Sequence, residues 1–320
     1  MSNPVRWGLL STARINNAII SGAAQSERTE IVAVASRDLA RAEAYAREHG
    51  LARAYGSYGA LLADDEIDVV YISLPNSLHV EWSIRALEAG KHVLCEKPLS
   101  KRPEAVEQAF DTAERAGRLL MEAFMYRHHP QTGKASELVR SGAIGELRQL
   151  RSALSFTLDD LTNVRLIPEL DGGALMDLGC YCISMQRLLG GEPERAFGFQ
   201  REGPTGVDVG FTGVLEFGDG VLGEFHCGFD LPAGTGLEAI GSTGSLYVPD
   251  PVRASDPHVE LNGERVDVED VDRYFLEVEN FSAAVRGDAE PLLGRADALG
   301  QARLIDALYR SAATGEAVSL

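Results

Sequence analysis

Cysteine is scarce in this sequence of 320 residues, which has only four, at Cys95, Cys180, Cys182 and Cys227. None of them forms a CxxC pair, and no histidine-rich partner lies at zinc-finger spacing. The adjacent His128 and His129 do not suggest a metal site either, because consecutive side chains rarely converge on one ion. We therefore expect no bound metal, and thiols that stay reduced, as in cytoplasmic proteins.

Long apolar runs are also missing. No stretch approaches the roughly 20 residues that a membrane helix needs, and the first seven residues contain no apolar segment of a secretory signal. These absences predict a cytoplasmic protein without a membrane partner.

Basic residues are also few relative to acidic ones. The chain has 30 lysines and arginines against 48 aspartates and glutamates, a formal net charge of -18. Nucleic acid and anionic membrane surfaces would repel such a chain, so neither is an expected partner. Small charged substrates are not excluded, because the local charge of a site can oppose the global sign.

The chain length of 320 residues and the share of 45% hydrophobic residues suffice for two ordinary globular domains. The first 125 residues alternate helical patterns with short apolar runs, which predict strands at 5–10, 30–35, 69–74, 92–95 and 119–123. This alternation is typical of a parallel sheet with helices on both faces. We expect residues 1–125 to form a doubly wound α/β domain, a Rossmann domain that binds a dinucleotide.

The rhythm changes after Pro130. Segments of period two predict strands at 146–157, 195–201, 207–217, 221–229, 236–240, 245–248 and 258–268, and helices are expected at 132–141, 174–189, 272–286 and 295–313. This pattern predicts an α+β domain over residues 126–320, with a large and mostly antiparallel sheet. Helices can cover only one face of such a sheet. We expect the other face to pack against a second subunit, in a homodimer or homotetramer.

The turn after the first strand is the expected pyrophosphate site, where backbone amides meet the start of a helix. Its residues are Ser11, Thr12, Ala13, Arg14 and Ile15. The usual glycine positions hold Ser11, Ala13 and Asn16, so the glycine signal is weak, and an ordinary strand-to-helix turn explains this segment better when it is read alone. Small side chains at 11 and 13 still permit close approach of the backbone.

The end of the second strand bears on the choice of cofactor. An NAD enzyme places an acid there for the ribose diol, whereas this chain has Ser36 and Arg37. A hydroxyl and a guanidinium suit a 2′-phosphate, which predicts NADP rather than NAD. The alternative is that Arg37 is merely a solvated side chain beside the helix cap Asp38.

Two polar segments follow the third and fourth strands of the first domain, at the sheet edge where ligands bind. The first contributes Leu74, Pro75, Asn76 and His79, and the second contributes Glu96 and Lys97. A lysine placed directly after an apolar strand and followed by proline is not a typical surface lysine. His79 also begins a helix, so capping explains it as well as a role toward the ribose does.

The sequence resembles the Gfo/Idh/MocA group, which includes glucose-fructose oxidoreductase and inositol dehydrogenase. The resemblance spans essentially the whole chain and is carried by RWGLLSTARI, ASRDLARA, SLPNSLH, AGKHVLCEKPLS, EAFMYRHHPQ and GGALMDLGCYCI. Within the group the chain is most similar to the NADP-dependent D-xylose 1-dehydrogenases and the dimeric trans-dihydrodiol dehydrogenases. The resemblance supports a dimer or larger assembly.

The resemblance implies a catalytic role for Lys97 and brings Asp177 and Tyr181 toward the same site. Many members of the group have histidine at the position of Tyr181. The spacing of four residues independently predicts that Asp177 and Tyr181 share one helix face. The resemblance also suggests substrate contacts for Asn163 and Arg165, and Arg127 is expected to line the site.

Oxidation of an alcohol requires the hydroxyl proton to leave. A free tyrosine, with a pKa near 10, is a poor base at neutral pH, but a nearby ammonium lowers that pKa. We therefore hypothesise that Tyr181 is the general acid/base and that Lys97 activates it, while Asp177 binds a substrate hydroxyl or holds Lys97. The opposite assignment, with Lys97 as proton donor, stays open.

These observations predict an NADP-dependent dehydrogenase or reductase of CH–OH groups, acting on a pyranose, a related aldose or a cyclic trans-diol. Two alternatives remain. One is a ketoreductase of nucleotide-linked sugars, although the loop at 159–171 supplies only Arg165 for a diphosphate. The other is a sensor that binds NADP(H) without turnover, which the weak glycine turn favours.

Overall fold

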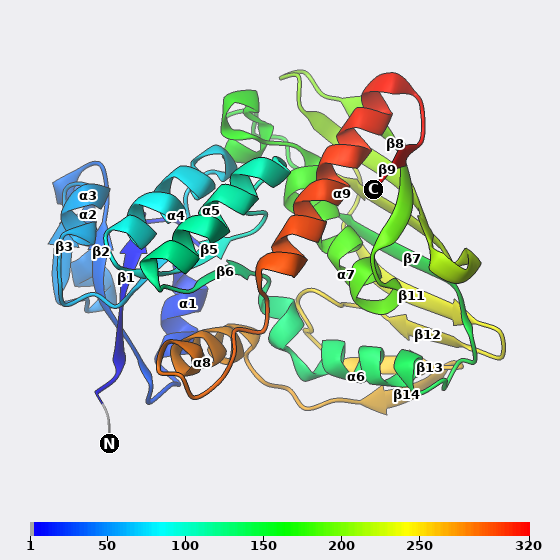
Figure 1. Cartoon of the computed structure of the whole chain (residues 1–320), viewed down its shortest axis with the longest axis horizontal. Helices are drawn as coiled ribbons and strands as arrows, with labels where there is room; N and C mark the ends of the chain where they lie inside the picture. Colours follow the sequence, from blue (N-terminus) through cyan, green and yellow to red (C-terminus); the bar gives the residue numbers. More distant parts are fainter. Residues whose placement is uncertain (1–2) are drawn as a thin grey trace. The chain divides into compact units, whose positions relative to one another are not determined.

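The computed structural model describes residues 3–320, which divide into two compact units (Figure 1). The first unit comprises the chain up to Ser100, Glu104–His128 and Val271–Leu299, and the second comprises Lys101–Pro103, His129–Asp270 and Gly300–Leu320. Apart from the three residues Lys101–Pro103, the chain passes into the second unit at His129, close to the predicted boundary after residue 125. The segment Val271–Leu299 differs from the prediction, because it belongs to the first unit and not to the second.

The first unit contains a parallel six-stranded sheet in the order β3-β2-β1-β4-β5-β6. Its strands are β1 (Val5–Leu10), β2 (Thr29–Ala35), β3 (Arg53–Tyr55), β4 (Val69–Ile72), β5 (His92–Glu96) and β6 (Leu120–Ala123). The doubly wound fold is confirmed. The edge strand β3 was not predicted, because three half-buried residues give no hydrophobic pattern.

Helices cover both faces of this sheet: α1 (Asn16–Ala23), α2 (Leu39–His49), α3 (Tyr58–Leu62), α4 (His79–Glu88), α5 (Pro103–Ala116) and α8 (Arg273–Val285). Helices α4 and α5 lie on one face, and α1 and α8 lie on the other (Figure 1). The helix cap expected at Asp38 is present at the start of α2. The Asp38 side chain accepts a hydrogen bond from Arg41 N, and Gly50 ends the helix at a φ of 68°.

The second unit contains a nine-stranded sheet in the order β14-β13-β12-β11-β7-β10-β9-β8-β15. Its strands are β7 (Leu147–Ser155), β8 (Pro193–Glu202), β9 (Asp208–Phe217), β10 (Leu222–Gly228), β11 (Gly234–Gly241), β12 (Ser245–Val248), β13 (His258–Leu261), β14 (Glu264–Asp267) and β15 (Val318–Ser319). Within residues 3–320, the strand pairings of this sheet are antiparallel except that of β7 with β10, which confirms the predicted sheet type. The strand expected over 258–268 is instead a hairpin, because Asn262 and Gly263 form a two-residue turn with φ of 54° and 81°.

One face of this sheet packs against helices. Ser152 of β7 donates a hydrogen bond to Cys182 O of α7 (Cys180–Gly190), and β12 and β13 contact α6 (Pro130–Arg140). The later part of α9 (Arg295–Thr314) lies near β8 and β9, through Leu308. Side chains on the strands alternate between this covered face and an exposed one, as period-two segments predict.

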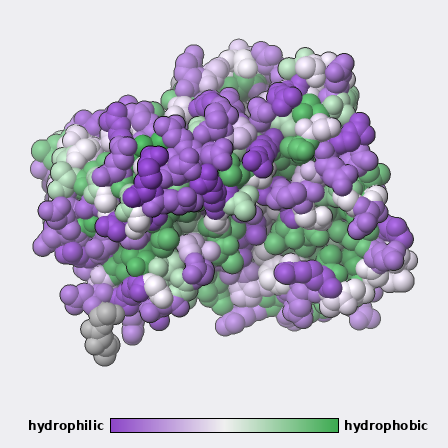
Figure 2. All heavy atoms as spheres, viewed as in Figure 1, coloured by the Kyte–Doolittle hydropathy of each residue, from purple (hydrophilic) through white to green (hydrophobic). Residues whose placement is uncertain are grey.

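The surface is largely hydrophilic on the face seen in Figure 2, with hydrophobic side chains gathered in smaller areas. Across residues 3–320, no helix is both long and apolar enough to cross a membrane. Over the same range, no group of three or more His, Cys, Asp or Glu side chains is arranged to hold a metal ion.

Candidate active site

The candidate cofactor residues of the first unit lie just after four neighbouring strands of its sheet. Ser11–Ile15 follow β1, Ser36 and Arg37 follow β2, and Leu74–Asn76 follow β4. Glu96 is the last residue of β5, and Lys97 follows it. The carboxyl ends of parallel strands meet at one edge. The order β2-β1-β4 also contains the point where the direction of winding reverses, which is where ligands bind in open α/β sheets. The fold therefore brings these residues to one sheet edge.

The turn after β1 contains no glycine, but one of its residues has a backbone conformation that favours glycine. Ser11 has a φ of 145°, in a region that favours glycine. The buried side chain of Asn16 secures this turn, since its Nδ2 donates to Ser11 O at 2.8 Å and its Oδ1 accepts from Ser73 Oγ at 2.6 Å. Ser11 Oγ lies 2.8 Å from Ser73 Oγ. Side-chain hydrogen bonds thus hold a backbone shape that glycines usually permit.

The two residues after β2, Ser36 and Arg37, differ in their exposure to solvent. Ser36 is buried, and its hydroxyl accepts a hydrogen bond from Asp38 N at 3.3 Å. Arg37 is exposed to solvent. A guanidinium in this position is available to a phosphate group at the end of β2.

The backbone around Lys97 is held from two sides. Beyond the cis Lys97–Pro98 peptide bond, Leu99 N donates to the buried Glu122 at 2.7 Å. His79 Nδ1 lies 2.9 Å from Pro98 O, and His79 Nε2 lies 2.7 Å from Leu74 O. These two contacts involve both ring nitrogens of His79, which is 1% exposed. His79 therefore ties together the segments that follow β4 and β5, and it supports the cofactor edge through them.

Buried acidic and phenolic groups surround the end of β5. The Tyr71 hydroxyl donates to Glu96, and burial, with the charge of Glu96, raises the pKa of Tyr71 well above its usual value. Burial also raises the pKa of Glu277 far above its usual value, and Glu96 adds to the shift. For Tyr274, burial and the negative charge of Glu96 raise the pKa to about 12, against the positive charges of Arg273 and Lys97.

The second unit carries Asp177 and Tyr181 on one helical segment. Asp177 lies in a π-helical turn, Leu175–Gly179, and Tyr181 lies in the first turn of α7, which follows directly. The predicted helix at 174–189 is therefore present, but with a wider first turn of a kind often found at functional sites. Tyr181 is 7% exposed. Arg165 Nε donates to Asp177 Oδ2 at 2.7 Å, so the loop before the helix is bonded to it.

The remaining candidates have local partners. Asn163 Oδ1 accepts from Arg165 N at 3.1 Å and so shapes its own loop. Arg127 forms an ion pair with Asp297 at 3.3 Å, within the first unit. The fold thus gathers the cofactor candidates in the first unit, and it joins Arg165 to Asp177 in the second.

Several polar residues near these candidates, in the first unit or in the second, were not predicted from the sequence. Tyr71 lies inside a continuous apolar strand and gave no signal of a polar role. Tyr274 and Glu277 lie on a late helix that was expected in the other domain, and Asp208 opens a strand of the second sheet. In each case only the tertiary structure reveals the buried hydroxyl or carboxyl group.

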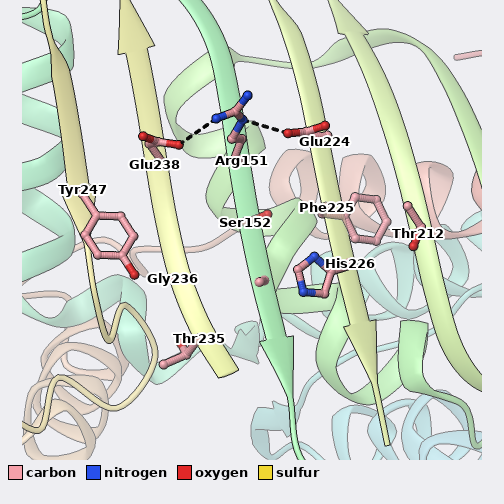
Figure 3. Close-up of a pocket in the computed structure, with 11 residues that line it drawn as sticks. Arg151, Ser152, Thr212, Glu224, Phe225, His226, Thr235, Gly236, Glu238 and Tyr247 are labelled. Atoms are coloured by element: carbon pink, nitrogen blue, oxygen red, sulfur yellow. Dashed lines mark hydrogen bonds and ion pairs between the residues drawn. The ribbon is translucent and has the colours of Figure 1, made fainter. Parts of the chain in front are cut away.

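The outer face of the nine-stranded sheet has a hollow of about 480 Å³. Figure 3 shows Arg151 of β7 between Glu224 of β10 and Glu238 of β11. The Arg151 guanidinium lies 2.7 Å from the Glu224 carboxylate and 3.4 Å from that of Glu238. His226 and Tyr247 also line this hollow, which contains none of the predicted site residues.

Comparison with known proteins identifies a family for the chain. Residues 6–124 match the model of an oxidoreductase family with an NAD-binding Rossmann fold, and residues 132–247 match the GFO/IDH/MocA C-terminal domain. The chain belongs to the Gfo/Idh/MocA oxidoreductase family. The predicted family and fold class are therefore confirmed.

Individual members of the Gfo/Idh/MocA family are similar over about three quarters of the chain or more. D-xylose 1-dehydrogenase (NADP(+)) 2 of Haloferax volcanii is 42% identical, over 98% of this chain and 99% of that protein. Trans-1,2-dihydrobenzene-1,2-diol dehydrogenase of Bos taurus is 33% identical, over 77% of this chain and 75% of that protein. A 3-ketoreductase of Actinomadura kijaniata, solved with NADP and TDP-benzene, is 33% identical with a TM-score of 0.91, over 97% of this chain and 98% of that one.

Proposed function

We propose that this oxidoreductase transfers a hydride between NADP and a CH–OH carbon of a pyranose, a related aldose or a cyclic trans-diol. Support comes from the similarity to a D-xylose 1-dehydrogenase over almost the full length of both chains. The named relatives are dehydrogenases and reductases, which favours an enzyme over a sensor that binds NADP(H) without turnover.

The first unit fits a dinucleotide. The turn after β1 supports this assignment, since Ser11 has a backbone conformation that favours glycine, the residue usual in pyrophosphate turns. We assign the pyrophosphate to Ser11–Ile15, the 2′-phosphate to Ser36 and Arg37, and the nicotinamide end to Leu74–Asn76, Glu96 and Lys97. His79 belongs to this set as the support of the last two segments.

Bound NADP would supply the hydride acceptor, and its reduced form the donor. The side chains must then move a proton to or from the substrate oxygen. We assign this proton to the phenol oxygen of Tyr181, and we assign to Lys97 the positive charge that brings the phenol pKa toward neutrality. Asp177 accepts a hydrogen bond from a substrate hydroxyl, and Arg165 and Asn163 hold the loop that carries this contact.

The observation that favours an uncharged substrate is the pairing of the cations around this loop. Arg165 is bonded to Asp177 at 2.7 Å, and Asp171 of the same loop pairs with Lys101 at 2.8 Å and with Arg102 at 2.9 Å. Each of these cations already has a carboxylate partner, whereas a diphosphate needs cations that can turn toward it. A free sugar or diol needs only hydrogen-bonding groups.

The similarity to a 3-ketoreductase solved with TDP-benzene makes a nucleotide-linked sugar the second candidate. One experiment separates the two. The protein is incubated with NADP and D-xylose, other aldoses or trans-diols, and with NADPH and a TDP-linked ketosugar, while absorbance at 340 nm is followed. We expect turnover with free sugars or diols. Turnover confined to the TDP-linked compound would replace our substrate class, and flat traces with all of them would reject the reaction.

We also propose that the protein forms a homodimer or homotetramer through the outer face of the nine-stranded sheet. This face exposes the large apolar side chains of Phe199, Val214 and Leu222, which helices do not cover in the single chain. The row formed by Arg151, Glu224 and Glu238 lies on the same face (Figure 3). Light scattering of the protein and of Val214→Arg tests the assembly. A monomeric wild type would reject it.

A further inference from the structure

We propose that Asp208 is a positioning residue for the reaction, because its carboxylate fixes the start of the helical segment that carries Asp177 and Tyr181. The inference rests on the roles proposed above for Asp177 and Tyr181. Asp208 itself belongs to the sheet and not to this helix, since it is the first residue of β9.

The carboxylate of Asp208 is buried and accepts hydrogen bonds from two elements. Its Oδ2 accepts from Leu175 N at 2.7 Å, and its Oδ1 accepts from the Tyr309 hydroxyl of α9 at 2.8 Å. The residue is 4% exposed. Burial raises the pKa of Asp208 to about 6, against the hydrogen bonds from Leu175, Tyr309 and the Ala174 amide. At neutral pH the group is therefore mainly ionised, and it faces the positive end of the helix.

The helical segment needs such a partner from outside. The residue before its π turn is Ala174, which offers no side-chain cap, and Leu175 is itself fully buried. A buried amide without a partner costs about as much free energy as a lost hydrogen bond, and water cannot replace the partner here. Asp208 provides it from 33 positions further along the chain. Asp177 lies two residues beyond this amide, and Tyr181 follows one turn later.

The glycine turn before the helix is shaped around the same carboxylate. Gly173 has a φ of 130°, and a Cβ atom there would lie 2.1 Å from Asp208 Oδ1 and 3.0 Å from the Tyr309 hydroxyl. Only glycine therefore allows Asp208 to reach this site. Gly173 N donates to Arg165 O at 2.9 Å, and Gly173 O accepts from Asp177 N at 3.0 Å. The turn thus connects the Asp208 contact to both members of the Arg165–Asp177 pair.

Tyr309 holds the carboxylate from its other side. Its ring packs edge-on against Phe211, with centroids 5.8 Å apart, and Lys101 Nζ lies 5.7 Å from the ring centroid. Lys101 in turn pairs with Asp171 at 2.8 Å. Asp208 is therefore supported by β9 and α9, and it is the point at which both elements are bonded to the helix start.

Three variants test the proposal. Asp208→Ala removes both hydrogen bonds. Asp208→Asn can keep both, because the amide oxygen accepts from Leu175 N while the amide nitrogen donates to Tyr309. Tyr309→Phe removes one of the two. Glu216→Ala is the control, since Glu216 lies on the same strand in an exposed ion pair with Arg195.

We expect kcat to fall about 10-fold to 100-fold in Asp208→Ala, because small displacements of reacting groups cost that much. Asp208→Asn and Glu216→Ala should stay within about threefold of wild type, and Tyr309→Phe should lie between. The dissociation constant of NADP should not change in any variant, which separates positioning from general damage to the fold. A kcat for Asp208→Ala within threefold of wild type, or an equal loss in Asp208→Asn, would overturn the proposal.

Hydrogen exchange of the backbone amides at 175–181 gives a readout that does not depend on turnover. We expect faster exchange in Asp208→Ala and Tyr309→Phe than in wild type and Asp208→Asn, and unchanged exchange would overturn the proposal. If Asp208→Ala does not fold, Tyr309→Phe and Asp208→Asn decide by the same measurements. A wild type that turns over no substrate would reject the proposed function, whereas exchange would still report on Asp208.

Discussion

Trp7 Nε1 donates a hydrogen bond to Ser282 Oγ at 3.1 Å, and this contact joins the first strand of the chain to α8. Both residues are fully buried, and the Ser282 hydroxyl also lies 2.7 Å from Thr29 Oγ1 of β2. The ring of Phe281 packs edge-on against Trp7, with centroids 5.8 Å apart. A helix from near the end of the chain therefore completes the core of the first unit.

Ser282→Ala is expected to lower the free energy of unfolding by about 1–3 kcal/mol, because the buried indole N–H loses its acceptor. The midpoint of guanidinium unfolding measures the change. Ser21→Ala is the control, since Ser21 lies exposed on α1, and it should change stability by less than about 0.5 kcal/mol. Equal midpoints for the two variants would show that the hydrogen bond to Trp7 does not stabilise this unit.

Arg37→Ala is expected to reduce kcat/KM for NADP by about 10-fold to 100-fold, the loss of a charge-assisted hydrogen bond to the 2′-phosphate. With NAD, which lacks this phosphate, kcat/KM should change by less than about threefold. Steady-state kinetics with both cofactors measures the ratio, and Arg47→Ala, at the other end of α2, is the control. An equal loss with both cofactors would mean that Arg37 does not recognise the phosphate.

Glu277→Gln is expected to become more stable than wild type as the pH rises. Burial raises the pKa of Glu277 well above its usual value of 4.5, and neither carboxylate oxygen has a hydrogen-bond partner among the described residues. The folded protein therefore keeps a proton that the unfolded chain releases above pH 4.5. The contribution of Glu277 to the wild-type free energy of unfolding is therefore fully present below about pH 4.5. It decreases as the pH rises toward the pKa of the folded state, by up to about 1.4 kcal/mol per pH unit.

Urea unfolding at pH 5 and pH 8 measures this difference. Glu279→Gln on the same helix is the control, because Glu279 is partly exposed and pairs with Arg28 at 2.6 Å. Only Glu277→Gln should gain stability relative to wild type between the two pH values. The same pH dependence in wild type and Glu277→Gln would contradict a proton on Glu277.

The features of the fold that could be predicted from the sequence are those that depend on hydrophobic periodicity and on nearby residues. The parallel sheet, the cap of α2 at Asp38 and the location of Lys97 after β5 all follow from apolar runs and polar residues near them. These features need no knowledge of distant partners.

Contacts between distant segments could not be predicted in this way. Nothing near Ser282 in the sequence points to Trp7, and nothing near Asp208 points to Leu175. The same holds for the glycine positions of the β1 turn, where Ser11 was read as a weakened signal. Its conformation is maintained by Asn16 and Ser73, and the second of these lies 62 positions away.

Turnover by Tyr181→Phe and Lys97→Met, with NADP and the best substrate of the panel, tests the central claim most directly. The account predicts that kcat of Tyr181→Phe falls by about 10²-fold to 10⁴-fold, the usual contribution of a general acid/base, while NADP binds as in wild type. Lys97→Met should lose activity as well, because the phenol pKa would stay near 10. Near-wild-type turnover in both variants would contradict the account.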